Sequence, residues 1–408
     1  MLEHAAAYER RAAEVAHRLY ANLDAIEHYR RALALLGTGH PVEAAVLHGR
    51  LGELLHLLAR YDDARQAWER AKADTRAEDV IELAHLHRKI GNAFRDEYRY
   101  EDARRAYDTA EAALPPVMDL RDERTAPVWA QIQLERITMA YWLGEIDAML
   151  RLVERVRPVL ETIGDTSQRA RLHQISAIAL LRRDRYNGSP EAVVHARAYL
   201  DTVEAIQDPH AVPAAHFQLG FALLWSGDLT DAEQHISRAL DLAERNGDLS
   251  LQGRCLTYLT VIARQRGDVD RVRAYAKHSM DIAKASQMHD YIGAAHGNLA
   301  WLAWRAGDLH VVHSHGQAAL EAWRKLPAGY ICAWTARWPL IGAALAERDT
   351  AGAVEHARTL LDERQQRPPR SIETALEAAV QAAQSGDLAA AHAILEAARA
   401  PARDLGYL

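Results

Sequence analysis

Apolar and small residues recur along the chain at helical spacing, in blocks of two helices, and four of these blocks have a Gly-Asp turn between the helices. The clearest block, 216–240 (HFQLGFALLWSGDLTDAEQHISRAL), predicts two short helices joined at Gly227-Asp228. Glycine can adopt the left-handed conformation of such a turn, and aspartate can cap the helix that follows. Gly220 lies where the two helices must approach closely, and Ala232 is a small residue on the returning helix. This block therefore predicts a helical hairpin.

The hairpin pattern recurs ten times along the chain. Residues equivalent to Ala232 mark the second helix of each unit, and in chain order they are Ala25, Ala64, Ala103, Met149, Ala192, Ala232, Val272, Val312, Ala353 and Ala391. Successive markers lie 38 to 46 residues apart. One hairpin cannot bury both faces of its helices, so each unit needs a neighbour on either side. The pattern therefore predicts a regular array.

Three of the units resemble the tetratricopeptide (TPR) repeat: 216–240, Leu51–Ala71 and Ile90–Ala110. In each, a Leu-Gly or Ile-Gly pair on the first helix is followed by small residues on the second. The spacing between successive markers exceeds the roughly 34 residues of a standard TPR unit, so each helix should be longer than usual. The resemblance implies an all-α fold, a right-handed α-solenoid of about ten TPR-like helix pairs with a concave groove, running as a single superhelix over 1–408.

Three stretches interrupt the period. Pro115-Pro116 breaks the helical pattern near 111–128 and predicts a longer loop there. The stretches 182–191 (RRDRYNGSPE) and 365–370 (QQRPPR) add turn residues. The period resumes directly after each stretch, so none of them separates independent domains.

The long period, the Gly-Asp-Leu turns and phrases such as LDLAERNGD (240–248) resemble the helical sensor arrays of bacterial STAND-type ATPases. That family includes maltotriose-activator-like and large LuxR-type transcription regulators. The resemblance implies an array that binds an inducer or partner and so relieves inhibition of an attached ATPase or effector domain. The chain holds no GxxxxGK[ST] phosphate loop and no helix-turn-helix unit, so such domains would lie outside it. The last residues, ARDLGYL (402–408), would begin another helix, and we expect a segment of a longer protein.

Charge and composition narrow the class of protein. The formal net charge of −7 argues against a nucleic-acid binder, although a local basic strip is compatible with it. Residues 1–20 are charged and amphipathic, unlike a signal peptide, and no stretch approaches roughly 18 uncharged apolar residues. We therefore expect a cytoplasmic protein that has no contact with a membrane. Cys255 and Cys332 have no metal or redox spacing and should be small buried residues.

Aromatic residues gather on the first helices, which line the concave groove in TPR proteins. The candidates are Phe217, Phe221, Leu224 and Trp225 in the sixth unit, Trp301, Trp304 and Arg305 in the eighth, Trp334 and Trp338 in the ninth, and Tyr141 and Trp142 in the fourth. An aromatic groove suits sugar faces, flat ring systems or apolar side chains of a peptide. The same residues could instead fill the space between longer helices, and both interpretations stay open.

Basic and amide residues form a second set on the same helices. They are His85, Arg88, Asn92 and Arg95 in the third unit, Arg171 and Gln174 in the fifth, and Arg254 and Arg264 in the seventh. They could bind a carboxylate or phosphate, or they could be solvated side chains paired with nearby acids. Arg88 and Asn92 match half of the two-carboxylate clamp of co-chaperone TPR arrays. Glu135 occupies the place of an asparagine of that clamp, so we reject the full motif.

The sequence predicts no cofactor, metal site or catalytic centre. Serines and cysteines lack a base at helix spacing, and no carboxylate pair stands out. His310, His313 and His315 form a cluster, but the last two are two residues apart and would point to different sides of a helix. Four other histidines share one place on the first helix and are expected to pack: His48, His87, His216 and His296.

The leading hypothesis is a non-catalytic sensing domain of a bacterial signal-transduction ATPase or transcription regulator. It would bind a protein, a peptide or a small-molecule inducer in its concave groove. The alternative is a stand-alone TPR scaffold that holds a partner protein or peptide. A third interpretation, an enzyme built on a helical solenoid, has no catalytic residues to support it.

Overall fold

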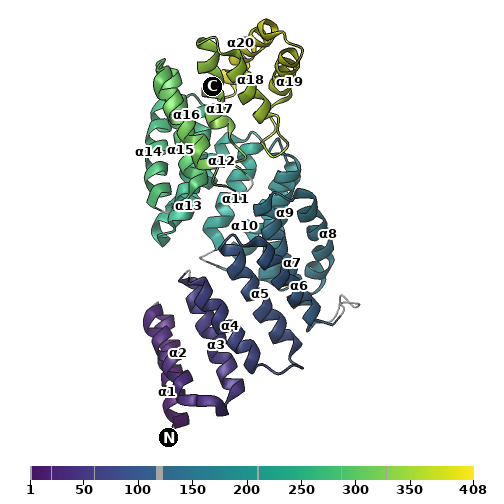
Figure 1. Cartoon of the computed structure of the whole chain (residues 1–408), viewed down its shortest axis with the longest axis vertical. Helices are drawn as coiled ribbons and strands as arrows, with labels where there is room; N and C mark the ends of the chain where they lie inside the picture. The colour runs from purple at the N-terminus through teal and green to yellow at the C-terminus, as the bar shows by residue number, and fades with distance from the viewer. Residues whose placement is uncertain are drawn as a thin grey trace. The chain divides into compact units, whose positions relative to one another are not determined.

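The computed structural model describes residues 2–19, 21–58, 60–115, 123–208, 211–285, 287–326 and 329–408. Within these ranges the chain forms twenty α-helices, one short 3₁₀ turn at Gly37–Gly39 and no β-strand (Figure 1). No helix in these ranges is both long enough and apolar enough to cross a bilayer. The chain divides into two compact units, residues 1–140 with 147–165, and residues 141–146 with 166–408.

The first unit is built from helix pairs that follow one another along the chain. Its helices are α1 (Leu2–Arg18), α2 (Asn22–Leu36), α3 (Pro41–Leu57), α4 (Tyr61–Asp74), α5 (Val80–Asp96), α6 (Tyr100–Ala113), α7 (Ala126–Leu143) and α8 (Ile146–Ile163). The facing ends of α7 and α8, residues 141–146, belong to the second unit.

The second unit continues the same plan. Its helices are α9 (Thr166–Arg183), α10 (Pro190–Ala205), α11 (Ala211–Trp225), α12 (Leu229–Asn246), α13 (Leu249–Gln265), α14 (Val269–Ala285), α15 (His289–Ala306), α16 (Leu309–Trp323), α17 (Trp334–Ala346), α18 (Thr350–Leu360), α19 (Arg370–Gln384) and α20 (Leu388–Asp404). The first helices of successive pairs, from α9 to α17, contact one another in chain order.

The ten marker residues confirm the predicted helix pairs. Each lies at the third or fourth position of the second helix of its pair, and each is at most 1% exposed. The described residues therefore form an all-α solenoid of TPR-like hairpins. A single superhelix over 1–408 stays a prediction. The loop predicted near 111–128 falls largely on residues 116–122, which lie outside the described ranges.

The Gly-Asp turns have the predicted geometry. Their four glycines, Gly227, Gly267, Gly307 and Gly386, have φ angles between +71° and +87°. The aspartate after each glycine accepts a hydrogen bond from the backbone N–H three residues later, over 2.8 to 3.2 Å. Each turn thus ends one helix and caps the next.

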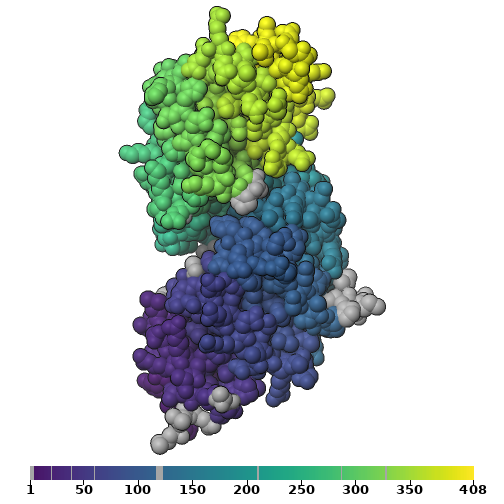
Figure 2. All heavy atoms as spheres, in the orientation of Figure 1, coloured from purple at the N-terminus to yellow at the C-terminus, as the bar shows by residue number. Residues whose placement is uncertain are grey.

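Small residues allow the two helices of a pair to cross closely. A Cβ atom on Gly220 would lie 2.9 Å from the carbonyl oxygen of Ala232 and 2.6 Å from Cγ1 of Ile236. Gly52 meets Trp68, and Gly91 meets Tyr107, in the same way. Figure 2 shows that, within each unit, side chains fill the spaces between neighbouring helices on the face turned to the viewer. The Leu-Gly and Ile-Gly pairs are therefore packing residues.

Two of the sequence breaks meet in the second unit. Arg185, in the turn between α9 and α10, donates hydrogen bonds to the carbonyl oxygens of Gln365 and Asp362. Gln366 returns a hydrogen bond from its side chain to the carbonyl oxygen of Tyr186 over 3.2 Å. The α9–α10 turn and the α18–α19 connection are thus tied together across 180 residues of sequence.

Candidate functional site

A pocket of about 650 Å³ opens in the first unit between α1, α3 and α5, the first helices of three successive pairs. We call it the α1–α3–α5 pocket. Its charged lining residues are Arg18, Arg50, Arg88 and Lys89 against Glu14 and Glu53. Four cations against two carboxylates give this surface a formal charge of +2, whereas the whole chain carries −7. The pocket therefore favours a negatively charged ligand.

The repeat places two of these cations at equivalent positions. Arg50 directly precedes Leu51-Gly52 on α3, and Lys89 directly precedes Ile90-Gly91 on α5. Gly52 packs against Trp68, and Gly91 packs against Tyr107, an aromatic ring of the second helix in each pair. Because this contact fixes the rotation of the first helix, Arg50 and Lys89, each two residues before its glycine, lie on the same face of their helices. The two cations consequently line one pocket.

Glu53 connects these cations. It accepts hydrogen bonds from Nη1 of Arg50 at 3.0 Å and from Nζ of Lys89 at 2.8 Å. Burial raises the pKa of Glu53, but the two cations outweigh burial and hold that pKa below its usual value. Glu53 is therefore an ionised bridge between α3 and α5, which fixes the spacing of the two cations.

Arg88 and Asn92, two residues predicted from sequence, line the same pocket. Nη1 of Arg88 lies 3.4 Å from Oε1 of Glu135, and no described residue accepts a hydrogen bond from its Nε. Asn92 accepts a hydrogen bond from the Tyr107 hydroxyl at 2.8 Å, which leaves its NH₂ group to donate to a ligand. Arg95, predicted in the same set, instead pairs with Glu135 at 2.6 Å and with Asp96.

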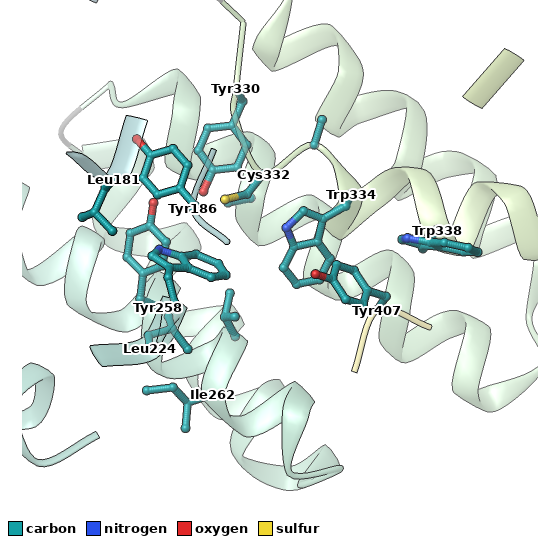
Figure 3. Packing of buried hydrophobic residues seen from close by; sticks show 14 of the residues in the cluster. Leu181, Tyr186, Leu224, Tyr258, Ile262, Tyr330, Cys332, Trp334, Trp338 and Tyr407 are labelled. Carbon is teal, nitrogen blue, oxygen red and sulfur yellow. The ribbon is translucent and has the colours of Figure 1, made fainter. Parts of the chain in front are cut away.

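Five aromatic residues of the second unit form one cluster: Tyr186, Phe217, Phe221, Trp225 and Tyr258. Phe217 stacks on Phe221 with ring centroids 5.7 Å apart, and Phe221 meets Tyr258 edge-on at 4.6 Å. Phe217 and Trp225 are 4% and 7% exposed. Figure 3 shows Tyr186 and Tyr258 in this packed region beside Tyr330 and Cys332. The three aromatic residues predicted in the sixth unit, Phe217, Phe221 and Trp225, thus come together and contact mainly other aromatic rings. Leu224 is buried in the same core.

The other predicted aromatic residues are distributed between the interior and the surface. Trp301 and Trp338 are 1% and 0% exposed, and Trp334 is buried as well. Trp304 is half-buried beneath Arg399, and the exposed Arg305 lies over the Trp301 ring. Trp142 is 52% exposed and meets the half-buried Tyr141 edge-on. In this structure a ligand can therefore reach Trp142 and Arg305 but not Trp301 or Trp338.

The two predicted arginines of α13 have different surroundings. The guanidinium of Arg254 lies 4.4 Å from the centroid of the Phe217 ring. Arg264 is 1% exposed and hydrogen-bonded to backbone carbonyl groups, as described below. In the fifth unit, Arg171 donates to the side chain of Gln174. Ligand contact by any predicted residue stays a prediction.

The histidines of the eighth unit point apart, as their spacing predicts. His315 lies with its Nδ1 3.0 Å from Nδ1 of His296, whereas His313 pairs with Glu347 at 2.9 Å. No group of three or more His, Cys, Asp or Glu side chains in the described ranges could hold a metal ion. Cys255 and Cys332 are both buried, and burial raises the pKa of each thiol to about 12.

Sequence reasoning missed several residues of these sites. Arg50 and Lys89 carried a usable signal, because both precede an aliphatic-Gly pair in consecutive units. Arg182 lies 4.5 Å over the Tyr141 ring. Arg182 and Tyr186 both fall in the stretch 182–191, for which the sequence predicts only a break in the period. No local pattern indicates that this turn packs on Phe221.

A sequence model of the tetratricopeptide repeat matches residues 212–285 of the chain. This range contains the block 216–240 and the unit that follows it. No curated protein has a significant sequence match to the chain.

Solved structures share the fold at low sequence identity. A Rap protein complexed with Competence and Sporulation Factor has 14% identity and a TM-score of 0.60, with 88% of this chain and 97% of that chain covered. Aspartyl phosphate phosphatase F from Bacillus subtilis has 13% identity and a TM-score of 0.53, with 88% and 94% covered. A STAND protein with a TPR sensor from Pyrococcus horikoshii has 15% identity and a TM-score of 0.49, with 86% and 54% covered. The first two of these likenesses show a TPR-like helical repeat fold.

Proposed function

We propose that the chain is a non-catalytic binding protein whose α1–α3–α5 pocket holds an acidic segment of a partner protein or peptide. The observation that carries the proposal is the local excess of cations, four against two carboxylates, on a chain of net charge −7. Arginine and lysine are the side chains that bind carboxylates through charged hydrogen bonds.

The hydrogen-bonding capacity of the pocket supports this choice. Glu53 is occupied by Arg50 and Lys89, so it offers little repulsion to an incoming carboxylate. The exposed Arg18 and Arg50 and the amide of Asn92 supply donors toward the pocket. A ligand with two or three carboxylates spaced along an extended backbone would satisfy these donors together.

Apolar surface in the same pocket provides a second recognition element. Leu57 is the exposed apolar residue of its lining, whereas Tyr29, Leu54 and Trp68 also line it but are at most 4% exposed. An apolar side chain placed between acidic residues would be buried against Leu57, which adds affinity that salt does not screen. We therefore expect a ligand that alternates acidic and apolar residues.

We also propose the finer function expected from sequence, a sensing domain that controls an attached ATPase or effector domain. The Rap protein with the similar fold is complexed with Competence and Sporulation Factor, which supports a binding role for this architecture. A small anionic inducer is the second candidate ligand, because a pocket of about 650 Å³ is in the usual range for small molecules.

A peptide selection tests the proposed function. The whole chain is immobilised, random nine-residue peptides are selected on it, and the binding region is located by amide hydrogen exchange. We expect selected sequences rich in Asp and Glu, and protection confined to α1, α3 and α5. Selection of uncharged or basic peptides, or protection elsewhere, would overturn the proposal. Displacement of a selected peptide by a small dicarboxylate at equal concentration would favour the inducer.

A further inference from the structure

Residues 405–408, which follow α20, are seated on the second unit. Tyr407 and Leu408 are 7% and 3% exposed, and both backbone N–H groups donate to the carbonyl oxygen of Ala402. The Tyr407 ring meets Trp334 edge-on, with centroids 4.5 Å apart (Figure 3). These residues, expected to begin another helix, instead form a docked segment, which we call the 405–408 segment.

Arg264 of α13 holds the backbone of this segment. Its Nε donates to the carbonyl oxygen of Gly406 at 3.3 Å, and its Nη2 donates to that of Tyr407 at 2.8 Å. Its Nη1 donates to Oδ1 of Asn298 on α15 and to the carbonyl oxygen of Thr335 on α17. One guanidinium thus connects three first helices to two consecutive peptide groups of the segment.

The surroundings of Arg264 make this contact mutually stabilising. Among the described residues, no carboxylate forms an ion pair with Arg264, and burial lowers its pKa to about 9. A buried cation without a counter-ion is unfavourable unless acceptors satisfy its N–H groups. Two of its four acceptors come from the 405–408 segment, so loss of the segment leaves Arg264 poorly satisfied.

The site selects glycine at one position. Gly406 has a φ of +74°, and a Cβ atom there would lie 2.6 Å from Cα of Gln265 and 2.8 Å from its nitrogen. These are backbone atoms of α13, which cannot move aside as a flexible side chain can. The next two residues bury an aromatic ring against Trp334 and an aliphatic side chain. The surface therefore recognises glycine, then an aromatic, then an aliphatic residue.

We propose that this surface of α13, α15 and α17 is a second peptide-binding site, for a short segment with the order glycine, aromatic, aliphatic, and that the 405–408 segment fills it as an internal ligand. A partner's segment binds there only when residues 405–408 leave. A tethered segment has an effective concentration in the millimolar range, so it suppresses weaker competitors. This site is in the second unit and does not depend on the α1–α3–α5 pocket.

A matched pair of glycine variants tests the proposal. Gly406→Ala should release the segment, whereas Gly386→Ala changes a glycine of similar φ, +86°, that has no atom within 4 Å of its added Cβ. The probe is a fluorescent peptide of residues 404–408, Asp-Leu-Gly-Tyr-Leu. It should bind Gly406→Ala at least tenfold more tightly than it binds the wild type or Gly386→Ala, and replacing its glycine with alanine should abolish binding. Equal affinity for all three proteins would overturn the proposal.

The wild type provides a second measurement if Gly406→Ala loses its helical circular dichroism. Amide exchange at Tyr407 and Leu408 is followed with and without a millimolar excess of the unlabelled peptide. Displacement predicts exchange at least fivefold faster in the presence of the peptide and unchanged exchange with the alanine-substituted peptide. No acceleration by the glycine-containing peptide would contradict an internal ligand.

Discussion

Nη2 of Arg185 donates a hydrogen bond to the carbonyl oxygen of Asp362 at 2.9 Å, and so joins two parts of the chain that are 177 residues apart. The same guanidinium reaches the carbonyl oxygen of Gln365 at 3.1 Å. Most contacts in a solenoid are between neighbouring repeats, so this long-range contact is a distinct element of the second unit.

Arg185→Ala should therefore destabilise the second unit. The variant loses two charged hydrogen bonds and leaves two carbonyl groups with fewer partners. We expect its free energy of unfolding, measured in urea, to fall by about 1 to 3 kcal/mol. Arg183→Ala is the control, because Arg183 is 44% exposed and pairs only with the local acids Asp184 and Glu191 among described residues. It should change stability by less than about 0.5 kcal/mol. Equal effects of the two variants on stability would contradict a stabilising role for the long-range contact of Arg185.

Two helix glycines should respond to alanine with opposite signs. In Gly220→Ala the new Cβ meets backbone atoms of Ala232 and Ile236 within 3.0 Å, which predicts a loss of about 1 to 3 kcal/mol. In Gly253→Ala the nearest atom is Cγ2 of Ile282 at 3.4 Å, so the higher helix propensity of alanine should stabilise the protein by up to about 1 kcal/mol. Thermal unfolding of both variants distinguishes close helix crossing from loose packing.

Two histidine pairs should make stability depend on pH. Nδ1 of His216 lies 3.0 Å from Nδ1 of His235, and His296 and His315 repeat this contact. Burial lowers the pKa of both His216 and His296 to about 4. The first pair has four charged groups nearby and the second pair has one: Arg197, Arg238, Glu204 and Asp231 for the first, and Lys284 for the second.

The sign of the pH effect follows from these pKa values. The unfolded chain binds protons near pH 6.5, and the folded histidines only near pH 4, so the folded state loses stability as pH falls through this window. We expect a loss of about 1 kcal/mol per histidine between pH 7.5 and 5.5. This loss is measured from the urea midpoints of the wild type and of the double variant His216→Gln/His296→Gln at both pH values. A pH dependence of equal size in both proteins would show that these pairs do not cause it.

Substitution of a buried tryptophan should lower the stability of the protein and should not remove a ligand contact. Trp338 is 0% exposed, so Trp338→Ala should cost about 3 to 5 kcal/mol through the cavity that it leaves. Trp142 is 52% exposed, and Trp142→Ala should change stability by less than about 1 kcal/mol. Guanidinium unfolding compares them. A stable Trp338→Ala variant would mean that its ring is not part of the core.

The fold could be predicted because each helix pair repeats the same local requirements. A small residue such as Ala232 lies at the crossing point, and in four pairs a Gly-Asp turn ends one helix and caps the next. These requirements act over a few residues, so they appear directly in the sequence.

The candidate sites were less predictable because they depend on contacts between distant units. Phe217 lies on a first helix, where periodicity allows either a groove or a core position. The structure buries it against Tyr258, which is in the next pair. Likewise the sequence gives no sign that Arg264 has the 405–408 segment as its partner. Arg88 and Asn92 can be found from sequence because they match half of the two-carboxylate clamp. Arg50 can be found only by comparing consecutive repeats, in which a cation precedes the aliphatic-Gly pair.

The affinity of Arg50→Ala for the selected acidic peptide tests the central claim most directly. Arg50 lines the α1–α3–α5 pocket, is 63% exposed, and has Glu53 three residues away as its ion-pair partner. Arg105, 73% exposed on α6 with Asp102 three residues away, is not part of the described pocket lining and is the matched control.

By fluorescence anisotropy, Arg50→Ala should weaken binding about tenfold, equivalent to about 1.4 kcal/mol, and the difference should shrink as salt is raised. Arg105→Ala should stay within about twofold of the wild type, because a surface pair outside the pocket contributes little. Equal affinities of wild type, Arg50→Ala and Arg105→Ala would contradict recognition of an acidic segment in this pocket.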